Sequence, residues 1–316
     1  IAGQKRKTPC SKAKLPLGPR KVNQGVSHLT EWKPLVFDQP MSRLGLEETL
    51  LGGQSFSWTA TSESSWKGVI GNSIVELRLE DTKLEWRTSK KSPLTEIKIR
   101  DYLWIEPSFT EAVDSLPWRS DPVLNRCMKD LPGLRILRQP MDEVLFVFLL
   151  SSVKSIPQIK EMRELVTQKY GESLELDLWS FPGWERLAEI PEAELRSLKM
   201  GYRAKYVRGV AGQIANDPSI LTDIVKQPYE EAKAKLLNLP GVGPKIADCC
   251  LLFGAARTQA FPIDTWISKT LEKRYSLGGW SNHQQVHFAI KHYGKHAGLA
   301  QQFLFSAERL GLHEKG

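Results

Sequence analysis

Leu236-Leu-Asn-Leu-Pro-Gly-Val-Gly-Pro-Lys245-Ile-Ala-Asp248 is the stretch of this 316-residue chain that decides its fold. A helical pattern over 229–238 ends just before the glycines, and the proline after them suits the first position of a second helix, predicted over 244–256. Glycine lets the backbone between the two helices turn tightly, with its N–H groups facing outward. These groups would lie beside a positive helix N-terminus, which is an arrangement that binds phosphate.

Helix, Leu-Pro-Gly-Val-Gly and helix together form the helix-hairpin-helix motif, which is typical of binding to the backbone of nucleic acids. Its candidate contacts are Gly241, Val242 and Gly243. The alternative is a tight turn between two helices with a purely structural role. The pattern therefore favours a nucleic-acid partner.

Lys245 stands in the first turn after the hairpin, at the start of a helix that is apolar nearly all round and is therefore expected to be buried. Desolvation and a positive helix end both disfavour an ammonium group, so this environment favours a nucleophilic amine. Cys249 lies one turn further along the same face, where it could exchange a proton with the amine. The simpler alternative is a surface ion pair between Lys245 and Asp248.

Nineteen residues after this lysine, Phe261-Pro-Ile-Asp264-Thr-Trp266 places Asp264 as the N-cap of a helix predicted over 265–275. Such an aspartate is usually only a cap. A fixed carboxylate near an amine is also what cleavage of an N-glycosidic bond requires. The carboxylate stabilises the positive charge that develops on the sugar while the amine attacks C1′.

The chain combines two architectures. Strand patterns alternate with turns up to about residue 88, and Gly71-Asn72 suits a two-residue hairpin because both residues tolerate positive φ. The predicted strands are Gln54–Ala60, Trp66–Ile70, Ile74–Leu79 and Leu84–Thr88, with Trp58, Trp66 and Trp86 packing on a sheet face. The predicted helices are Leu94–Trp104, Pro122–Asp130, Met141–Ser152, Ile156–Tyr170, Glu192–Lys199, Tyr202–Asn216, Tyr229–Asn238, Pro244–Ala256, Thr265–Tyr275, Asn282–His296 and Ala297–Leu310.

Strands followed by helices, without alternation, indicate an α+β protein. We expect a basic, flexible tail over 1–30, an antiparallel β domain over 31–120 and a helical domain over 121–316. The tail carries seven lysines and arginines and no acidic residue, so it accounts for most of the net charge of +8.

Composition excludes several classes. The longest apolar run, Val144–Leu150, is far shorter than the roughly 20 residues that cross a bilayer, so no membrane span is expected. Four cysteines, two of them adjacent, do not form a disulfide scaffold in a chain of this length. We therefore expect free thiols and an intracellular protein associated with DNA, in the nucleus of a eukaryote or in the cytoplasm or nucleoid of a prokaryote.

With these motifs the chain resembles the helix-hairpin-helix DNA glycosylases and, within them, the eukaryotic-type 8-oxoguanine DNA glycosylase family. The resemblance runs from about Gly52 to Leu310 and implies a β domain like half of a TATA-binding protein beside two helical subdomains. The motifs that carry it, in order, are Gly53-Gln-Ser-Phe-Ser-Trp58, Leu137-Arg-Gln-Pro140, Gly201-Tyr-Arg-Ala-Lys-Tyr-Val207, Leu239-Pro-Gly-Val-Gly-Pro-Lys-Ile-Ala-Asp-Cys249, Pro262-Ile-Asp264 and Leu304-Phe-Ser-Ala307.

The resemblance implies excision of 8-oxoguanine from damaged double-stranded DNA by a monomeric enzyme without a cofactor. Lys245 would form the Schiff base and Asp264 would be the catalytic carboxylate. The flipped base would be read by groups at four positions: the Gly53 carbonyl, Gln301, and a sandwich of Phe305 and Cys249. Backbone carbonyls of the hairpin are a candidate cation site, at Leu237, Leu239 and Val242.

The chain departs from the family pattern where the family reads the base opposite the lesion. Val153-Lys154-Ser155 replaces an asparagine run, and Gln158 replaces an arginine. Of the opposite-base residues, only Tyr202, as a wedge, and Arg203 are kept, and Trp266 replaces a histidine that contacts a phosphate. We therefore expect relaxed selectivity for the opposite base.

Three alternatives remain to be weighed. An iron–sulfur glycosylase is excluded because no cysteine follows Cys250. A glycosylase for alkylated bases would keep the aspartate without the lysine, whereas a non-catalytic helix-hairpin-helix protein would only hold DNA. The histidine pairs 283/287 and 292/296 have the spacing of metal ligands on one helix face, but without a third ligand they are expected to be solvated faces.

Overall fold

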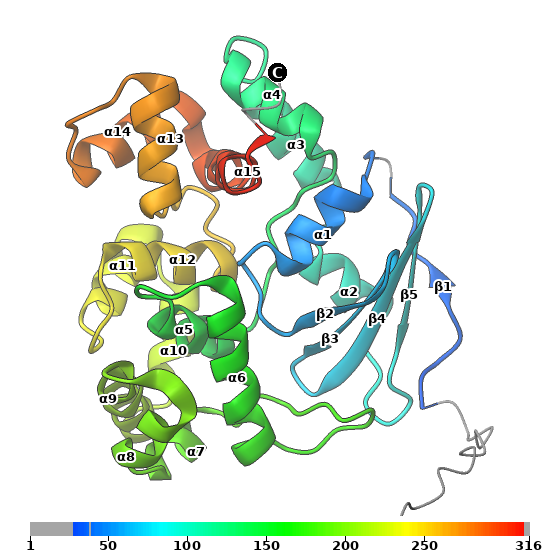
Figure 1. Cartoon of the computed structure of the whole chain (residues 1–316), viewed down its shortest axis with the longest axis vertical. Coiled ribbons are helices and arrows are strands. Elements are labelled where there is room, and N and C mark those ends of the chain that lie inside the picture. The colour runs from blue at the N-terminus through cyan, green and yellow to red at the C-terminus, as the bar shows by residue number, and fades with distance from the viewer. Residues whose placement is uncertain (1–27, 38, 313–316) are drawn as a thin grey trace, which may run out of the picture.

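The computed structural model describes residues 28–37 and 39–312, and most of the predicted basic tail lies outside them. An antiparallel sheet occupies one side of the molecule and helices the other (Figure 1). The α+β fold class, with strands first and helices after, is therefore confirmed. Within the described residues, no helix is long and apolar enough to cross a membrane.

The sheet has five strands in the order β1-β5-β4-β3-β2, all antiparallel. Ile70 pairs with Ser73, so the predicted two-residue hairpin is present, although only Gly71 of its two residues takes a positive φ. The strands are β1 (Lys33–Pro34), β2 (Trp58–Ser62), β3 (Ser65–Ile70), β4 (Ser73–Glu80) and β5 (Lys83–Thr88).

The core of the sheet domain contains the three predicted tryptophans, Trp58, Trp66 and Trp86, each almost completely buried. α1 (Arg43–Leu51) and α2 (Glu96–Tyr102) cover this core with apolar side chains that include Leu46 and Ile99.

The remaining helices share a second, larger core. They are α3 (Pro107–Ser115), α4 (Pro122–Asp130), α5 (Met141–Leu150), α6 (Ile156–Tyr170), α7 (Trp184–Glu189), α8 (Glu192–Leu195), α9 (Arg203–Asn216), α10 (Ser219–Lys226), α11 (Tyr229–Leu237), α12 (Pro244–Gly254), α13 (Thr265–Tyr275), α14 (Asn282–Tyr293) and α15 (Ala297–Arg309). A π turn (Arg196–Met200) follows α8, and a 3₁₀ turn (Gly294–His296) follows α14.

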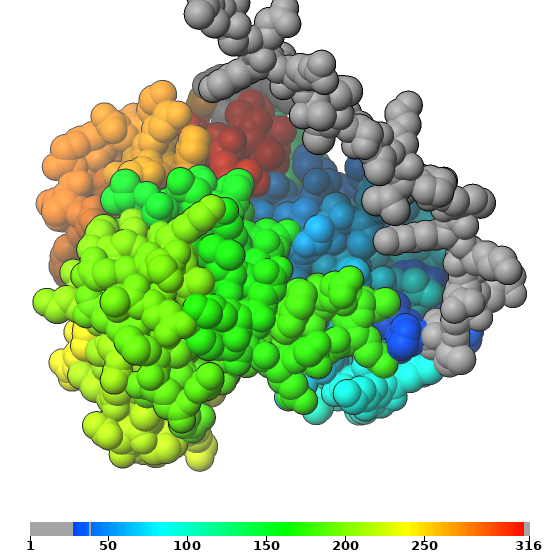
Figure 2. Space-filling model, turned by 60° about the horizontal axis from the view of Figure 1, so that its bottom comes forward, coloured from blue at the N-terminus to red at the C-terminus, as the bar shows by residue number. Residues whose placement is uncertain are grey.

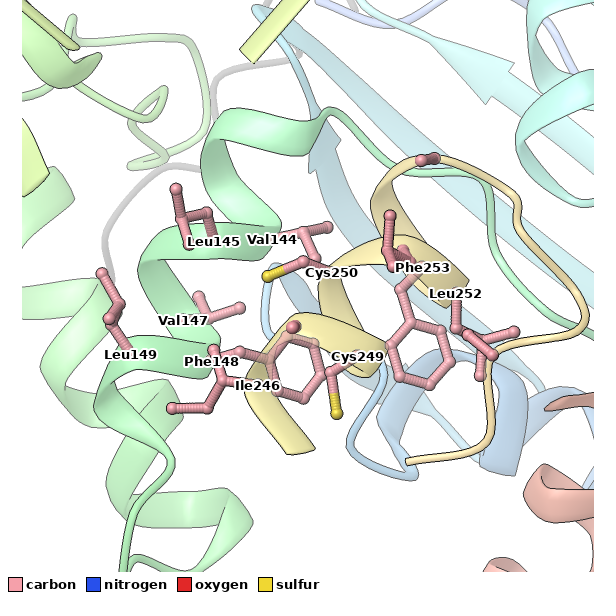
Figure 3. Close-up of a cluster of buried hydrophobic side chains, with 14 of the residues drawn as sticks. Val144, Leu145, Val147, Phe148, Leu149, Ile246, Cys249, Cys250, Leu252 and Phe253 are labelled. Carbon is pink, nitrogen blue, oxygen red and sulfur yellow. The ribbon is translucent and has the colours of Figure 1, made fainter. Parts of the chain in front are cut away.

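α5 and α12 form the centre of this core, because both helices are apolar on nearly every side. Phe148 of α5 stacks on Phe253 of α12, with ring centroids 5.5 Å apart (Figure 3). Burial of α12, predicted from its sequence, is confirmed. The same packing fixes the start of α12, where Lys245 stands.

Several elements differ from the sequence prediction. Helices α1, α3, α7 and α10 and strand β1 were not predicted. Residues 54–57 are not a strand: the side chain of buried Gln54 instead donates to the Arg135 carbonyl and accepts from Leu137 N–H, both at 2.7 Å. These bonds take the segment before β2 away from the sheet and toward the helical core.

The last residues assigned to the tail lie on the sheet. Leu29 is buried and bridges to Ser89, and Thr30 donates from its backbone to the Thr88 carbonyl. The segment 171–183, green in Figure 2, extends across the molecule to the sheet side, where Glu175 contacts His28 at 3.2 Å.

Candidate active site

A cavity of about 1120 Å³ opens where the helix-hairpin-helix unit meets α6, α13 and α15. Lys245 and Asp264 both line it, although nineteen residues separate them. The other predicted residues on its wall are Gly53, Val153, Lys154, Tyr202, Arg203, Gly241, Gly243, Trp266 and Phe305. Gln158, Val242, Cys249 and Gln301 do not line the cavity.

Lys245 is half-buried at the second position of α12. Its Nζ donates to the Ser151 hydroxyl at 3.2 Å and lies 5.1 Å from the centre of the Phe148 ring. The surface pair between Lys245 and Asp248 that the sequence also allowed is wrong. Asp248 is buried, and its carboxylate binds Lys233 Nζ and the hydroxyl of Tyr229.

The Asp248 network ties α12 to α11 beneath the hairpin. Replacing Asp248 with alanine is expected to lower the free energy of unfolding by about 3–5 kcal/mol, because the partly buried Lys233 ammonium would lose its counter-charge. Urea denaturation measures the change. The control is Asp114→Ala in the exposed pair with Arg119, where a loss below about 1 kcal/mol is expected. Equal losses in both variants would contradict this assignment.

Asp264 is the N-cap of α13, as predicted, and its Oδ1 accepts from the Ile267 N–H at 2.9 Å. Burial raises the pKa of this carboxyl above its ordinary value, and Ile267 N–H and the positive charge of Lys245 only partly oppose the rise. Within the described residues, the Lys245 amine and the Asp264 carboxylate form no ion pair with each other. The space between amine and carboxylate is therefore part of the cavity rather than closed by a direct bond.

Cys249 and Cys250 point in different directions from α12, with the Cys250 sulfur directed toward α5 (Figure 3). Burial raises the pKa of Cys249 to about 12, so its thiol stays protonated near neutral pH. The expected proton exchange with Lys245 is therefore not supported, and Cys249 offers a neutral sulfur instead. Cys249 and Cys250 are free thiols, as expected.

Two predicted base contacts are placed by α15. Phe305 is half-buried and lines the cavity, whereas Gln301, one turn earlier, is buried behind it. The Gln301 amide donates to the Pro262 carbonyl at 3.3 Å, and its buried Oε1 has no hydrogen-bond partner among residues 28–37 and 39–312. This acceptor is therefore already desolvated, next to the loop that carries Asp264.

Gly53 closes the cavity on the side of the sheet domain. Its φ is +101°, which a residue with a side chain rarely adopts. A Cβ there would lie 2.8 Å from Cδ1 of Ile156 and 4.0 Å from the ring of Phe305. Glycine thus brings the backbone close to the aromatic ring that lines the cavity.

The turn between α5 and α6 carries the residues that depart from the family pattern. Val153 is 92% exposed and has φ +53°, a left-handed conformation that is strained for a β-branched residue. Arg203, predicted to contact DNA, is only 4% exposed, and its guanidinium donates to the Ser152 carbonyl. Gln158 accepts from the Ser155 N–H as part of a capping box. Arg203 and Gln158 therefore shape this turn.

Two aromatic side chains remain exposed at the cavity. Tyr202 is 49% exposed, and its hydroxyl donates to Ser152 Oγ at 3.1 Å. Trp266 is 38% exposed, with the Lys269 ammonium 5.4 Å from its ring centre. Both rings are free to contact a ligand along one face.

The hairpin is a tight turn closed by a hydrogen bond from Val242 N–H to the Leu239 carbonyl at 3.1 Å. Gly241 has φ +78°, and a Cβ on it would clash with the Tyr206 ring at 2.4 Å. The Leu239 carbonyl, one of three in the candidate cation site with Leu237 and Val242, therefore already accepts one hydrogen bond.

The histidine pairs differ from each other. His283 and His287 are exposed. His292 is half-buried and binds Asp121 at 2.9 Å, and His296 binds Thr258 at 2.9 Å, so the second pair is not a solvated face. Over residues 28–37 and 39–312 there is no group of three or more metal-ligating side chains.

The cavity wall also contains residues that the sequence analysis missed, and three of them lie against predicted site residues. Phe148 and Ser151 contact the amine of Lys245, and Ile156 lies against Gly53. The sequence shows an apolar stretch that ends just before Ser151. It does not show that Ser151 contacts Lys245, which lies 94 residues away.

Two family profiles match the chain in succession. Residues 36–145 match the N-terminal domain of 8-oxoguanine DNA glycosylase, and residues 148–295 match the HhH-GPD superfamily of base excision DNA repair proteins. The N-glycosylase/DNA lyase OGG1 of Arabidopsis thaliana is 33% identical over 88% of this chain and 80% of its own length. The N-glycosylase/DNA lyase of Saccharomyces cerevisiae is 28% identical over 84% of each chain.

Two solved structures have folds similar to that of this chain. The 8-oxoguanine glycosylase/lyase of Clostridium acetobutylicum, in complex with DNA containing cytosine opposite 8-oxoG, has a TM-score of 0.79 at 26% identity, covering 90% of this chain and 99% of its own. MBOgg1 in complex with a low-affinity DNA ligand has a TM-score of 0.79 at 29% identity, covering 89% and 99%.

The fold and the hairpin followed by a lysine define a base excision DNA repair protein of the HhH-GPD superfamily. Within that superfamily, the chain belongs to the 8-oxoguanine DNA glycosylase family.

Proposed function

We propose that this protein binds duplex DNA, excises 8-oxoguanine and nicks the strand as an N-glycosylase/DNA lyase. The observation that carries the proposal is the placement of Lys245 and Asp264 on one cavity beside the hairpin. The names of the relatives in Arabidopsis and Saccharomyces support both activities. All the groups needed come from one chain, so the enzyme can act as a monomer.

In the proposed reaction, the neutral amine of Lys245 attacks C1′ of a nucleotide flipped out of the duplex. The bond from C1′ to the base breaks, its electron pair leaves with the base, and the base takes up a proton. The Asp264 carboxylate stabilises the positive charge on the sugar, and its burial strengthens that interaction because little water screens it. The amine nitrogen loses two protons, one to the departing base and one to O4′, which keeps the electron pair as the C1′–O4′ bond of the sugar ring breaks. The product is the Schiff base, from which the lyase step follows.

Recognition of the base is assigned to the four predicted contacts. The Gly53 carbonyl would accept the N7 hydrogen that 8-oxoguanine has and guanine lacks. The unpartnered Oε1 of Gln301 is available to an N–H on the Watson–Crick edge. Phe305 and the neutral sulfur of Cys249 would cover the two faces of the ring.

The DNA contacts are assigned to the exposed groups at the mouth of the cavity. The hairpin at Gly241 to Gly243 would bind the backbone of the damaged strand, and Tyr202 would insert beside the lesion. Val153 and Lys154 stand at the tip of the turn that would face the opposite base. An exposed valine offers no hydrogen bond with which to distinguish one base from another.

An excision assay on duplexes with 8-oxoguanine opposite each of the four bases tests this proposal. We expect excision from all four, with rates that differ by less than about 10-fold, because a bidentate base contact worth about 1–3 kcal/mol is missing. Duplexes with undamaged guanine or an alkylated adenine should stay intact. A cytosine preference well above 10-fold would contradict the selectivity, and no excision at all would contradict the function.

A further inference from the structure

The last turn of α5 touches the amine of Lys245 at two points. Phe148 and Ser151 are three residues apart and therefore lie on the same side of that turn. The Phe148 ring centre lies 5.1 Å from Nζ, and the Ser151 hydroxyl oxygen lies 3.2 Å from it. Within the described part of the chain, Ser151 provides the hydrogen bond of this amine to an oxygen atom, and the Cys249 thiol also interacts with the amine.

The Ser151 hydroxyl has a fixed direction. Its single proton is donated to the Phe148 carbonyl at 2.7 Å, so only its oxygen lone pairs remain for Lys245. Ser151 can therefore accept a hydrogen bond from the amine but cannot donate one to it. A neutral amine held through one N–H keeps its own lone pair turned away from the serine, and that lone pair is the one needed for attack on carbon.

The turn that carries Ser151 is held from several sides. The Phe148 ring stacks on Phe253 and meets Phe56 edge-on, with ring centroids 6.1 Å apart. The neighbouring Ser152 is bonded by Arg203 through its carbonyl and by Tyr202 through its hydroxyl. The acceptor for Lys245 is thus fixed in place before any ligand enters the cavity.

We infer that Ser151 is a positioning residue, which acts through Lys245 by holding one N–H of the amine and directing its lone pair into the cavity. The inference rests on the proposed role of Lys245 as the nucleophile. Ser151 itself does not touch the substrate in this role.

The test compares single-turnover excision of 8-oxoguanine by the full chain and by Ser151→Ala. The variant should lose about 10-fold in rate, because an amine misdirected by a fraction of an ångström seldom reaches the attack geometry. Its dissociation constant for the same duplex should stay within about 2-fold, because the DNA contacts are unchanged. Ser151→Thr, which keeps a hydroxyl able to bond the carbonyl three residues back, should restore most of the rate.

Ser115→Ala is the matched control. Ser115 also ends a helix, and its hydroxyl donates to the carbonyl of Ala112, three residues back, at 2.8 Å. Ser115 does not line the cavity. The Ser115→Ala variant should excise 8-oxoguanine at the wild-type rate. A wild-type rate in Ser151→Ala, or a loss that Ser151→Thr does not restore, would overturn the inference. A wild-type chain that neither excises the base nor forms a covalent adduct would instead overturn the proposed function.

Discussion

Replacing Lys245 with glutamine is expected to reduce excision of 8-oxoguanine by at least about 1000-fold and to abolish the covalent adduct with DNA. Glutamine has a similar length but carries an amide, whose nitrogen has no lone pair available for attack on C1′. Two lysines line the cavity in the described part of the chain, Lys154 and Lys245, and Lys245 is the one whose charge acts on the buried carboxyl of Asp264. Trapping with borohydride on a damaged duplex measures the adduct, because it reduces the Schiff base to a stable bond.

The control for this variant is Lys235→Gln, which also removes one positive charge. Lys235 lies on α11 in an exposed pair with Asp223 and does not line the cavity. It should trap DNA as the wild type does, apart from a small change in affinity. A wild-type protein that binds damaged DNA without forming any adduct would be a non-catalytic helix-hairpin-helix protein instead.

Replacing Asp264 with asparagine is expected to lower the excision rate by about 100–1000-fold, because the sugar would lose the charge that stabilises it. The helix should be retained, since asparagine caps a helix as well as aspartate does. The matched control is Asp217→Asn, an exposed aspartate that also accepts from a backbone N–H at the start of a helix. A full loss of rate in that control would show that the effect of Asp264 is not specific to the cavity.

The pH dependence separates the two roles of Asp264. Burial raises the pKa of Asp264. As pH is lowered, the wild-type excision rate should therefore begin to fall at a pH above about 4, the ordinary pKa of aspartate. The residual rate of Asp264→Asn should lack this acidic limb, because the amide does not titrate.

The thermal stability of Asp264→Asn should not fall together with its excision rate. The folded chain holds the Asp264 proton more tightly than the unfolded chain does, so the contribution of this group to stability is present at low pH and is lost as pH rises through the folded-state pKa. Asparagine removes that loss, and the variant should unfold at the same or a higher temperature near neutral pH. A variant that is both inactive and clearly less stable would indicate a structural role.

Local patterns predicted most of the elements. α4, α6 and α13 have the predicted bounds, because a proline or an N-cap marks the start of each. β3, β4 and β5 extend the predicted strands by at most a residue at each end, because alternation and the Gly71 turn fix them.

The elements that were missed are short and lie among prolines. α3 begins at Pro107 and buries Phe109 and Ala112, a helical spacing that the nearby prolines made look like a linker. Residues 54–57 lead directly into the strand pattern of β2, but Gln54 is bonded to a segment about 80 residues away. Such long-range bonds override local preference, and no single-sequence pattern contains them.

The site follows the same division. The nucleophile and carboxylate candidates came from motif spacing, and the structure places both on one cavity. Arg203 was assigned to DNA binding from the family resemblance, yet it is buried against the Ser152 carbonyl. Ser151 could not be assigned, because only the tertiary packing of α5 against α12 brings it to Lys245.

The bonds of Gln54 bear on how this enzyme could be divided or recombined. Its side chain bonds Arg135 and Leu137, and its carbonyl accepts from Gln139, so the Gly53 wall is fastened to the chain that leads into α5. A chimera that took only the helical half, from residue 141 onward, would keep Lys245 and Asp264 but leave the cavity without its wall at Gly53. Transferring lesion specificity to another scaffold would therefore require Gln54 and the bonded segment 135–139 to be moved together.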